Sequence, residues 1–406
     1  MFLPVDEQIR RIRAGAESIV PEDELVAKLE RSAREDRPLL IKQGFDPTRP
    51  DLHIGHGVSI HKLRTFQELG HRVVFVMGDF TARVGDPSGR DETRPMLSEE
   101  EIESNLATYE DQVFRILDPE ATEIRKNSEW LAGLALPDIL RLTSQYTVAR
   151  MLERDDFAAR HREGRPISLV EFLYPMMQAY DSVALRADVE LGGTDQRFNL
   201  LLGRTLQERA GQEPQVCLIM PLLRGTDGHR KMSKSYGNYV GIAMEAGETF
   251  GRVMSIPDTL LDEWLVIVSS ASGEALATRR AQAETDPLAA KRWLAGDLVA
   301  RYHGAAAAGK AREAFDRLHR RREVPEDVPA VSLSLGERGT LWIAHILRDS
   351  GLAASSSEAG RLIRQGAVRV DGSVIREGDL RLGAGEYLVQ RGKRTFARVS
   401  LAEADC

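Results

Sequence analysis

The alternation of short apolar segments with longer amphipathic segments constrains the fold more than any other feature of this chain. The expected strands are residues 37–44, 72–80, 121–127, 187–192 and 216–221. Between them, apolar side chains recur at helical spacing, most clearly over 98–117, where Ser98 and Glu101 form a capping box. Strands that alternate with helices predict an α/β fold with a Rossmann-type, doubly wound parallel sheet.

The strand pattern stops near residue 242. Residues 243–323 contain helical patterns only, and the proline-containing segment 324–335 is expected to be a linker. Two short helical patterns and a hairpin with Asp371-Gly372 at its turn follow, which predicts a small α+β domain. We therefore expect an α/β domain over 1–242, a helical domain over 243–328 and a third domain over 336–400.

Charge is distributed unevenly along the 406 residues. The whole chain has a net charge of −7, whereas residues 336–400 carry 11 basic and 7 acidic side chains, a net charge of +4. A small basic domain on an acidic body predicts contact with a nucleic acid through that domain.

The two cysteines, Cys217 and Cys406, form neither a disulfide framework nor a cluster of metal ligands. We therefore expect a reducing compartment and no metal bound by the protein itself. No apolar run approaches the roughly 18 residues of a membrane span, and the N-terminus lacks the apolar core of a signal peptide. These features predict a cytoplasmic protein without membrane contact.

Polar loops follow four of the predicted strands, over 44–49, 78–89, 192–196 and 225–235. If these strands are parallel, the loops meet at the carboxyl edge of the sheet, where open α/β folds bind ligands. The sequence thus predicts one shared cleft.

Two of these loops lead to or contain short motifs suited to phosphate. "HIGH" places His53 and His56 at the start of a helix, where unpaired N–H groups favour anions, and Gly55 leaves room for a flat ligand. "KMSKS" supplies the ammonium groups of Lys231 and Lys234 about 180 residues later. Together the motifs predict a site for a polyanion.

A third pattern indicates the second ligand. Tyr174, Gln178 and Asp181 stand at positions i, i+4 and i+7 of a predicted helix and so share one face. A phenol, an amide and a carboxylate that face a cleft would suit a zwitterion with a hydroxyl group.

The order of "GFDPT", "HIGH", "GDPSG", "YPMMQAYD", "GGTDQ" and "KMSKS" resembles the tyrosyl-tRNA synthetases, a class I aminoacyl-tRNA synthetase family. Residues 341–375 resemble the S4 RNA-binding domain that bacterial members carry. The resemblance implies a tyrosine–tRNA ligase that uses ATP with Mg²⁺, tyrosine and tRNA(Tyr). It also implies a homodimer, with its contact in a helical insertion at about 130–165.

The resemblance assigns roles to individual residues. Tyr174, Gln178 and Asp86 would hold the tyrosine ammonium, Asp181 the hydroxyl and Gln196 the carboxylate, with Asp46 and Thr48 near substrate and phosphate. The catalytic residues would be His53, His56, Lys231, Lys234, Thr48, Arg90 and Arg94. Of these, Arg90 and Arg94 would reach across the subunit interface or toward pyrophosphate and the tRNA acceptor end. ATP would be bound by Gly55, His56, Ser233, Lys234 and Asp195, and RNA by Arg361, Arg364 and Arg369.

One position departs from the family pattern, and three other functions remain open. Lys42 stands where many bacterial members have a tyrosine that contacts the substrate hydroxyl, so the second hydroxyl partner is undetermined. The alternatives are a tryptophanyl synthetase, another HxGH nucleotidyltransferase, and a noncatalytic RNA-binding protein with a synthetase fold.

Overall fold

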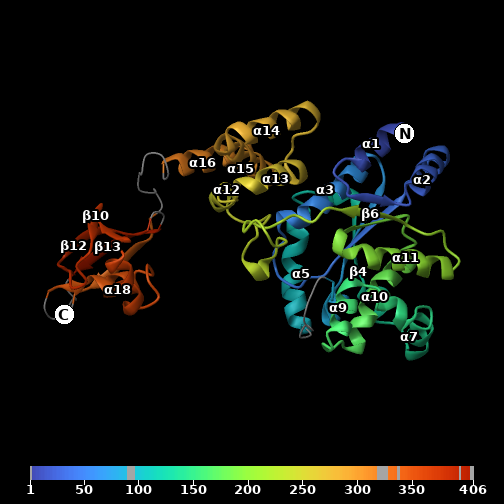
Figure 1. Ribbon diagram of the computed structural model, residues 1–406, viewed down its shortest axis with the longest axis horizontal. Coiled ribbons are helices and arrows are strands. Elements are labelled where there is room, and N and C mark those ends of the chain that lie inside the picture. Colours follow the sequence, from blue (N-terminus) through green and yellow to red (C-terminus); the bar gives the residue numbers. More distant parts are fainter. Residues whose placement is uncertain (1, 89–96, 318–327, 336–338, 393–394, 403–406) are drawn as a thin grey trace. The chain divides into compact units, whose positions relative to one another are not determined.

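The computed structural model describes residues 2–88, 97–317, 328–335, 339–392 and 395–402. The chain divides into two compact units, 1–308 and 309–406. Each unit is considered by itself (Figure 1).

The first unit is built on a six-stranded sheet with the order β1-β6-β5-β2-β3-β4. Its strands are β1 (Ser18–Val20), β2 (Leu40–Phe45), β3 (Arg72–Met77), β4 (Thr122–Lys126), β5 (Val189–Gly193) and β6 (Val216–Met220). β2 to β6 are parallel to one another, which confirms the predicted parallel sheet. The sequence did not predict β1, a three-residue strand that pairs antiparallel with β6 at the sheet edge.

Helices cover both faces of this sheet. They are α1 (Val5–Arg13), α2 (Glu22–Glu35), α3 (Ile54–Glu68), α4 (Thr81–Val84), α5 (Glu99–Val113), α10 (Leu169–Leu185) and α11 (Arg197–Arg209). The chain runs from β2 through α3 to β3 in one direction, and from β5 through α11 to β6 in the other. Right-handed crossovers therefore place α3 on one face and α11 on the opposite face, as Figure 1 shows.

The reversal of strand order falls between β2 and β5, which are direct neighbours. At such a switch point the loops leave the sheet in opposite directions and open a crevice at the carboxyl ends of the strands. The "GFDPT" and "GGTDQ" segments begin in these two strands and continue into the loops that follow them.

Short helices make up the segment before α10. They are α6 (Ser128–Leu131), α7 (Leu136–Thr143), α8 (Val148–Met151) and α9 (Asp155–Arg162). The helical pattern at 138–153 is thus two helices. α10 continues through Pro175 to Leu185, and the contact between Ser168 N–H and Glu171 Oε1 (2.8 Å) confirms its expected capping box.

Residues after 242 are helical, as predicted. The helices are α12 (Ala246–Met254), α13 (Leu261–Val268), α14 (Gly273–Thr285), α15 (Pro287–His303) and α16 (Ala305–Asp316). Trp264 and Phe250 are fully buried within this helical part. The basic run that follows α16 lies almost wholly outside the described residues.

The second unit contains a five-stranded sheet of order β10-β9-β12-β13-β7 and two short helices. Its elements are β7 (Ala330–Ser334), β8 (Leu341–Trp342), α17 (Ile343–Asp349), α18 (Ser356–Arg364), β9 (Val368–Val370), β10 (Ser373–Ile375), β11 (Arg381–Leu382), β12 (Gly385–Arg391) and β13 (Thr395–Ala402). β9 and β10 form the predicted hairpin, with Asp371 and Gly372 at φ 45° and 81°.

The expected linker over 324–335 is wrong in its second half, because residues 330–334 form β7, parallel to β13. Every second side chain of β7 is partly buried, and Leu333 packs on the core of this unit. The two prolines suggested a linker, but the alternating apolar side chains after them build a strand.

Candidate active site

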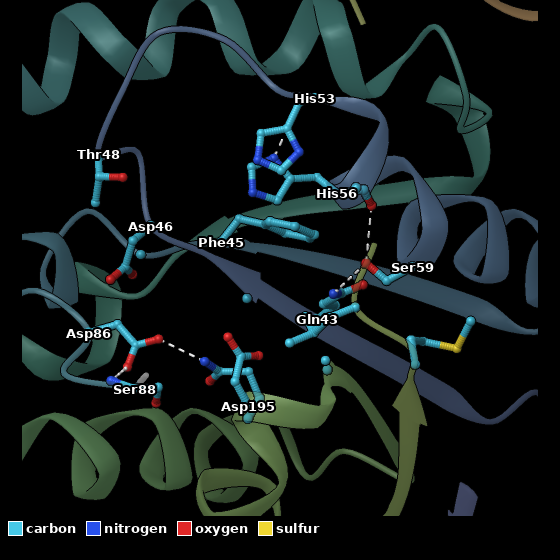
Figure 2. Close-up of a pocket in the computed structure, with 18 of the residues that line it drawn as sticks. Gln43, Phe45, Asp46, Thr48, His53, His56, Ser59, Asp86, Ser88 and Asp195 are labelled. Atoms are coloured by element: carbon cyan, nitrogen blue, oxygen red, sulfur yellow. Dashed lines mark hydrogen bonds between the residues drawn. The ribbon is translucent and has the colours of Figure 1, made fainter. Parts of the chain in front are cut away.

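The cleft at the carboxyl edge of the sheet has a volume of about 310 Å³ and contains every predicted substrate and catalytic residue that the structure describes. These are Asp46, Thr48, His53, Gly55, His56, Asp86, Tyr174, Gln178, Asp181, Asp195, Gln196, Lys231, Ser233 and Lys234. Arg90 and Arg94 lie outside the described residues. The expectation that the four loops meet is therefore confirmed, and Figure 2 shows side chains from three of them around one opening.

The two histidines stack on each other at the start of α3. Their ring centroids are 3.7 Å apart, with Phe45 edge-on to His56 (Figure 2). The backbone N–H of His53 donates to Nδ1 of His56 (3.3 Å), so the proton of a neutral His56 ring is on Nε2. Burial lowers the pKa of His56 to about 3 and that of His53 well below its usual value. These shifts favour neutral rings at pH 7, and a neutral imidazole can still donate one hydrogen bond without carrying positive charge.

Gly55 lies between this pair and the KMSKS segment. A Cβ atom at Gly55 would be 3.0 Å from Nδ1 of His53 and 3.7 Å from Cβ of Met232. The lack of a side chain therefore allows the two signature motifs to approach each other closely.

Each lysine of the KMSKS motif contacts an aspartate from another loop of the same cleft. Nζ of Lys231 is 3.0 Å from Oδ2 of Asp195. Nζ of Lys234 donates to the backbone carbonyl of Asp51 and is 3.9 Å from its carboxylate. Burial lowers the pKa of Lys234 to about 8, a shift that Asp51 opposes.

Asp181 is buried and firmly held beside Tyr174 and Gln178. Its Oδ1 accepts from Nε1 of Trp130 (2.7 Å) and its Oδ2 from Nδ2 of Asn127 (3.4 Å). Burial raises the pKa of Asp181 to about 7, while Lys42 acts in the opposite direction. Each carboxylate oxygen retains acceptor capacity for a further donor.

Asp46 accepts from the hydroxyl groups of Tyr174 (2.9 Å) and Thr81 (2.8 Å). A Cβ atom on Gly78 would overlap both Asp46 and Thr81, so glycine is required at this position. Burial raises the pKa of Asp46 to about 7.

A second polar chain joins the remaining predicted residues. Oδ2 of Asp86 accepts from Nε2 of Gln196 (2.7 Å), and Asn199 Nδ2 donates to the side-chain oxygens of Gln196 (3.1 Å) and Gln178 (2.9 Å). Amide and carboxylate oxygens thus surround the space beside Tyr174. Such a set of acceptors suits a ligand ammonium group.

The sequence interpretation missed several members of this site. Trp130 and Asn127 follow β4, and Asp51 lies between "GFDPT" and "HIGH". Gln43, whose Nε2 donates to Oγ of Ser59 (2.8 Å), lies on β2 (Figure 2). The signal for Asn127 was its place as the polar last residue of the predicted 121–127 strand, because that strand ends at the same sheet edge.

Among the described residues, no group of three or more histidine, cysteine, aspartate or glutamate side chains is placed to hold a metal ion. No helix of the described segments is long and apolar enough to cross a membrane.

Comparison with protein families identifies two regions. The family described as tRNA synthetases class I (W and Y) matches residues 34–320, and the S4 domain family matches residues 341–386. The first family includes both tryptophan and tyrosine enzymes, so the full-length relatives distinguish between them.

The chain is 49% identical over 407 residues to the tyrosine–tRNA ligase of Carboxydothermus hydrogenoformans, an alignment that covers 98% of this chain and 99% of that protein. It is 51% identical to the tyrosine–tRNA ligase of Oleidesulfovibrio alaskensis, again over 98% and 99% of the two chains. The chain belongs to the tyrosine–tRNA ligase family. Its membership confirms the resemblance given by the motifs and excludes the tryptophanyl alternative.

The fold of this family member also matches solved structures. The crystal structure of tyrosyl-tRNA synthetase complexed with L-tyrosine from Archaeoglobus fulgidus superposes with a TM-score of 0.62. That match covers 76% of this chain and 100% of the other at 23% identity, and therefore supports the fold alone.

Proposed function

We propose that the cleft binds L-tyrosine and ATP side by side, forms tyrosyl-adenylate and then transfers tyrosine to the 3′ end of tRNA(Tyr). The observation that carries this proposal is the meeting of the HIGH and KMSKS residues with Tyr174, Gln178 and Asp181 in one cleft. Neither group of residues alone would be specific, but together they support a phosphate site beside a site for a hydroxyl-bearing zwitterion.

Tyrosine is proposed to lie along α10. Tyr174, Gln178 and Asp86 would surround its ammonium group with oxygen acceptors, and Gln196 would orient its carboxylate. Asp181 would accept a hydrogen bond from the phenol hydroxyl, since hydrogen bonds from Trp130 and Asn127 already hold its carboxylate in place. Because two donors already hold this carboxylate, it needs little reorganisation when the substrate hydroxyl binds.

ATP is proposed to lie between α3 and the KMSKS segment, with Gly55, Asp195 and Ser233 on its nucleoside and phosphate groups. The tyrosine carboxylate attacks the α-phosphorus, the bond to the bridging oxygen breaks, and pyrophosphate leaves with that electron pair. An ionised carboxylate needs no general base at pH 7, so alignment and charge neutralisation supply the catalysis.

The donors for this step are His53, His56, Thr48, Lys231 and Lys234. The histidines would donate through neutral rings, whereas the lysines would exchange Asp195 and Asp51 for phosphate oxygens. Mg²⁺ is proposed to enter with ATP as part of the substrate. For Arg90 and Arg94 the family resemblance still predicts a reach across the subunit interface or toward pyrophosphate and the tRNA acceptor end.

RNA contact is proposed for the S4 region, where Arg361, Arg364 and Arg369 are exposed. The domain assignments keep their predicted bounds of 1–242, 243–328 and 336–400, except that the last domain begins with β7.

A cytoplasmic location and a homodimer are also proposed. Leu136, Leu140 and Val148, on α7 and α8, are 60% to 68% exposed and would be covered by a second copy.

Amino-acid-dependent exchange of pyrophosphate into ATP tests the proposal directly. Tyrosine should support exchange, while tryptophan and phenylalanine at the same concentration should not. Exchange with tryptophan alone, or none with any amino acid, would refute the assigned activity.

A further inference from the structure

A buried ion pair lies behind the cleft. Lys42 on β2 and Glu190 on β5 are neighbours in the parallel register, and Nζ of Lys42 is 2.9 Å from Oε1 of Glu190. Their side chains are 0% and 1% exposed. Desolvating two charges is costly, and apolar side chains of similar size are often equally or more stabilising, so stability alone does not account for this pair.

The contacts of the pair lead to the helix that lines the tyrosine site. Nζ of Lys42 also donates to Oγ of Ser182 (2.7 Å) and to the backbone carbonyl of Gln178 (3.2 Å). Oγ of Ser182 in turn donates to Oε2 of Glu190 (3.0 Å). The pair therefore fastens two strands to α10 at the turn that carries Gln178.

Glu190 also determines which way the Gln178 amide points. Nε2 of Gln178 donates to Oε1 of Glu190 (3.2 Å), and an ionised carboxylate can only accept hydrogen bonds. The amide nitrogen must face Glu190, which leaves Oε1 of Gln178 as the acceptor on the other side, where Asn199 donates to it (2.9 Å). Only this oxygen can accept a hydrogen bond from an ammonium group.

We propose that Lys42 and Glu190 are positioning residues that hold the Gln178 amide with its oxygen toward the substrate ammonium. Lys42 compensates the charge of Glu190, and Glu190 orients the amide. The inference rests on the proposed role of Gln178 in tyrosine binding, and it gives Lys42 a function different from that of the tyrosine found there in many bacterial members.

Lys42 does not take the place of that tyrosine at the hydroxyl. The hydrogen bonds to the Asp181 carboxylate come from Trp130 and Asn127, whereas those of Lys42 go to α10 and Glu190. Lys42 and Glu190 shift the pKa of Asp181 in opposite directions, so the pair should influence recognition of the amino group far more than discrimination at the hydroxyl.

Two inhibitors that each lack one end of tyrosine provide the test. Tyramine keeps the ammonium group, and 3-(4-hydroxyphenyl)propanoate lacks it; both keep the phenol. Inhibition constants are measured by pyrophosphate exchange for the unaltered protein, Glu190→Gln and Lys42→Met/Glu190→Met. The double variant leaves no lone buried charge and guards against misfolding in the single variant.

We expect the inhibition constant of tyramine to rise about 10-fold or more in both variants, while that of the propanoate changes less than about twofold. The rejection of phenylalanine should stay within about twofold of the unaltered protein. Glu171→Gln alters another buried ion pair of α10, with Arg160 (2.6 Å), and should leave the ratio of the two inhibition constants unchanged.

Four results would overturn the inference. Equal weakening of both inhibitors would indicate general damage, and reduced rejection of phenylalanine with tyramine binding intact would place the pair in hydroxyl recognition. Gln178→Ala separates the proposed ammonium site from the positioning role of the pair. If it leaves tyramine binding intact, the proposed ammonium site fails; if it weakens tyramine and the pair variants do not, only the inference fails.

Discussion

Lys231 and Lys234 belong to one motif but have different surroundings. The side chain of Lys231 is 42% exposed and paired with Asp195, whereas that of Lys234 is 11% exposed and bonded to the backbone of Asp51. Lys234 must leave a backbone acceptor to reach a phosphate, so its contact is expected chiefly in the transition state.

Lys234→Ala should therefore lower kcat for adenylate formation about 100-fold or more and change KM for tyrosine less than about threefold. Single-turnover measurement of adenylate formation checks both values. A KM for tyrosine that rises as much as kcat falls would contradict a transition-state role.

The lowered pKa of Lys234 predicts a dependence on pH. A lysine is charged below its pKa and neutral above it, and burial places this pKa near 8 in the free protein. We expect kcat/KM for ATP to fall as pH rises above about 8. Lys234→Arg keeps the charge at all these pH values, so this fall should disappear even if the variant is slower.

Asp181 is the residue on which tyrosine specificity should depend. Asp181→Ala removes the buried acceptor for the phenol hydroxyl and takes from Nε1 of Trp130 the carboxylate to which it donates. The ratio of kcat/KM for tyrosine to that for phenylalanine should fall at least about 10- to 100-fold. Pyrophosphate exchange with each amino acid measures this ratio, and an unchanged ratio would place hydroxyl recognition elsewhere.

At the scale of elements, α18 carries exposed arginines on a helix whose apolar side chains, such as Ile363, are buried in the core of the second unit. Arg361→Glu/Arg364→Glu should lower kcat/KM for tRNA in aminoacylation about 10- to 100-fold, because phosphate contacts supply much of RNA affinity. Pyrophosphate exchange should not change.

Arg376→Glu/Arg381→Glu is the matched control, since it reverses two exposed positive charges of the same unit outside α18. A loss of aminoacylation equal to that of the α18 variant would assign the effect to net charge rather than to this helix.

The success of sequence reasoning also varied by element. The five parallel strands were predicted from short segments that alternate with helical patterns, and their parallel order then placed the polar loops at one edge. Buried apolar runs mark β3 and β6 most clearly, whereas β4 contains only partly buried and exposed residues. β1 was missed because three residues give no periodicity, and β7 because Pro325 and Pro329 dominated the interpretation of its segment. Side-chain partners such as Asp51 for Lys234 could not be predicted, since they depend on how separate loops pack.

The Lys42–Glu190 pair marks the limit of motif reasoning. The sequence identified Lys42 as a departure from the family pattern. Glu190 lies 148 residues later, and nothing in the sequence around it indicated a contact with Lys42. Only the register of β2 with β5 places the two charges together.

At the scale of the whole molecule, the proposed homodimer makes the next prediction. Leu140→Glu/Val148→Glu introduces charge on the apolar side chains of α7 and α8 and should convert a dimer to a monomer. Analytical ultracentrifugation measures the mass. Leu288→Glu changes a leucine of α15 that is 55% exposed and should leave the mass unchanged. A dimer that survives both changes would place the contact elsewhere.

The parallel pairing of β7 with β13 has a practical consequence for dissecting this molecule. β13, the last strand of the described residues, pairs with a strand from before the region that matches the S4 family, so the boundary of that match is not a safe place to cut. A fragment beginning at residue 341 would expose the hydrogen-bonding edge of β13 and invite self-association. Expression of the isolated RNA-binding part should therefore start upstream of Ala330.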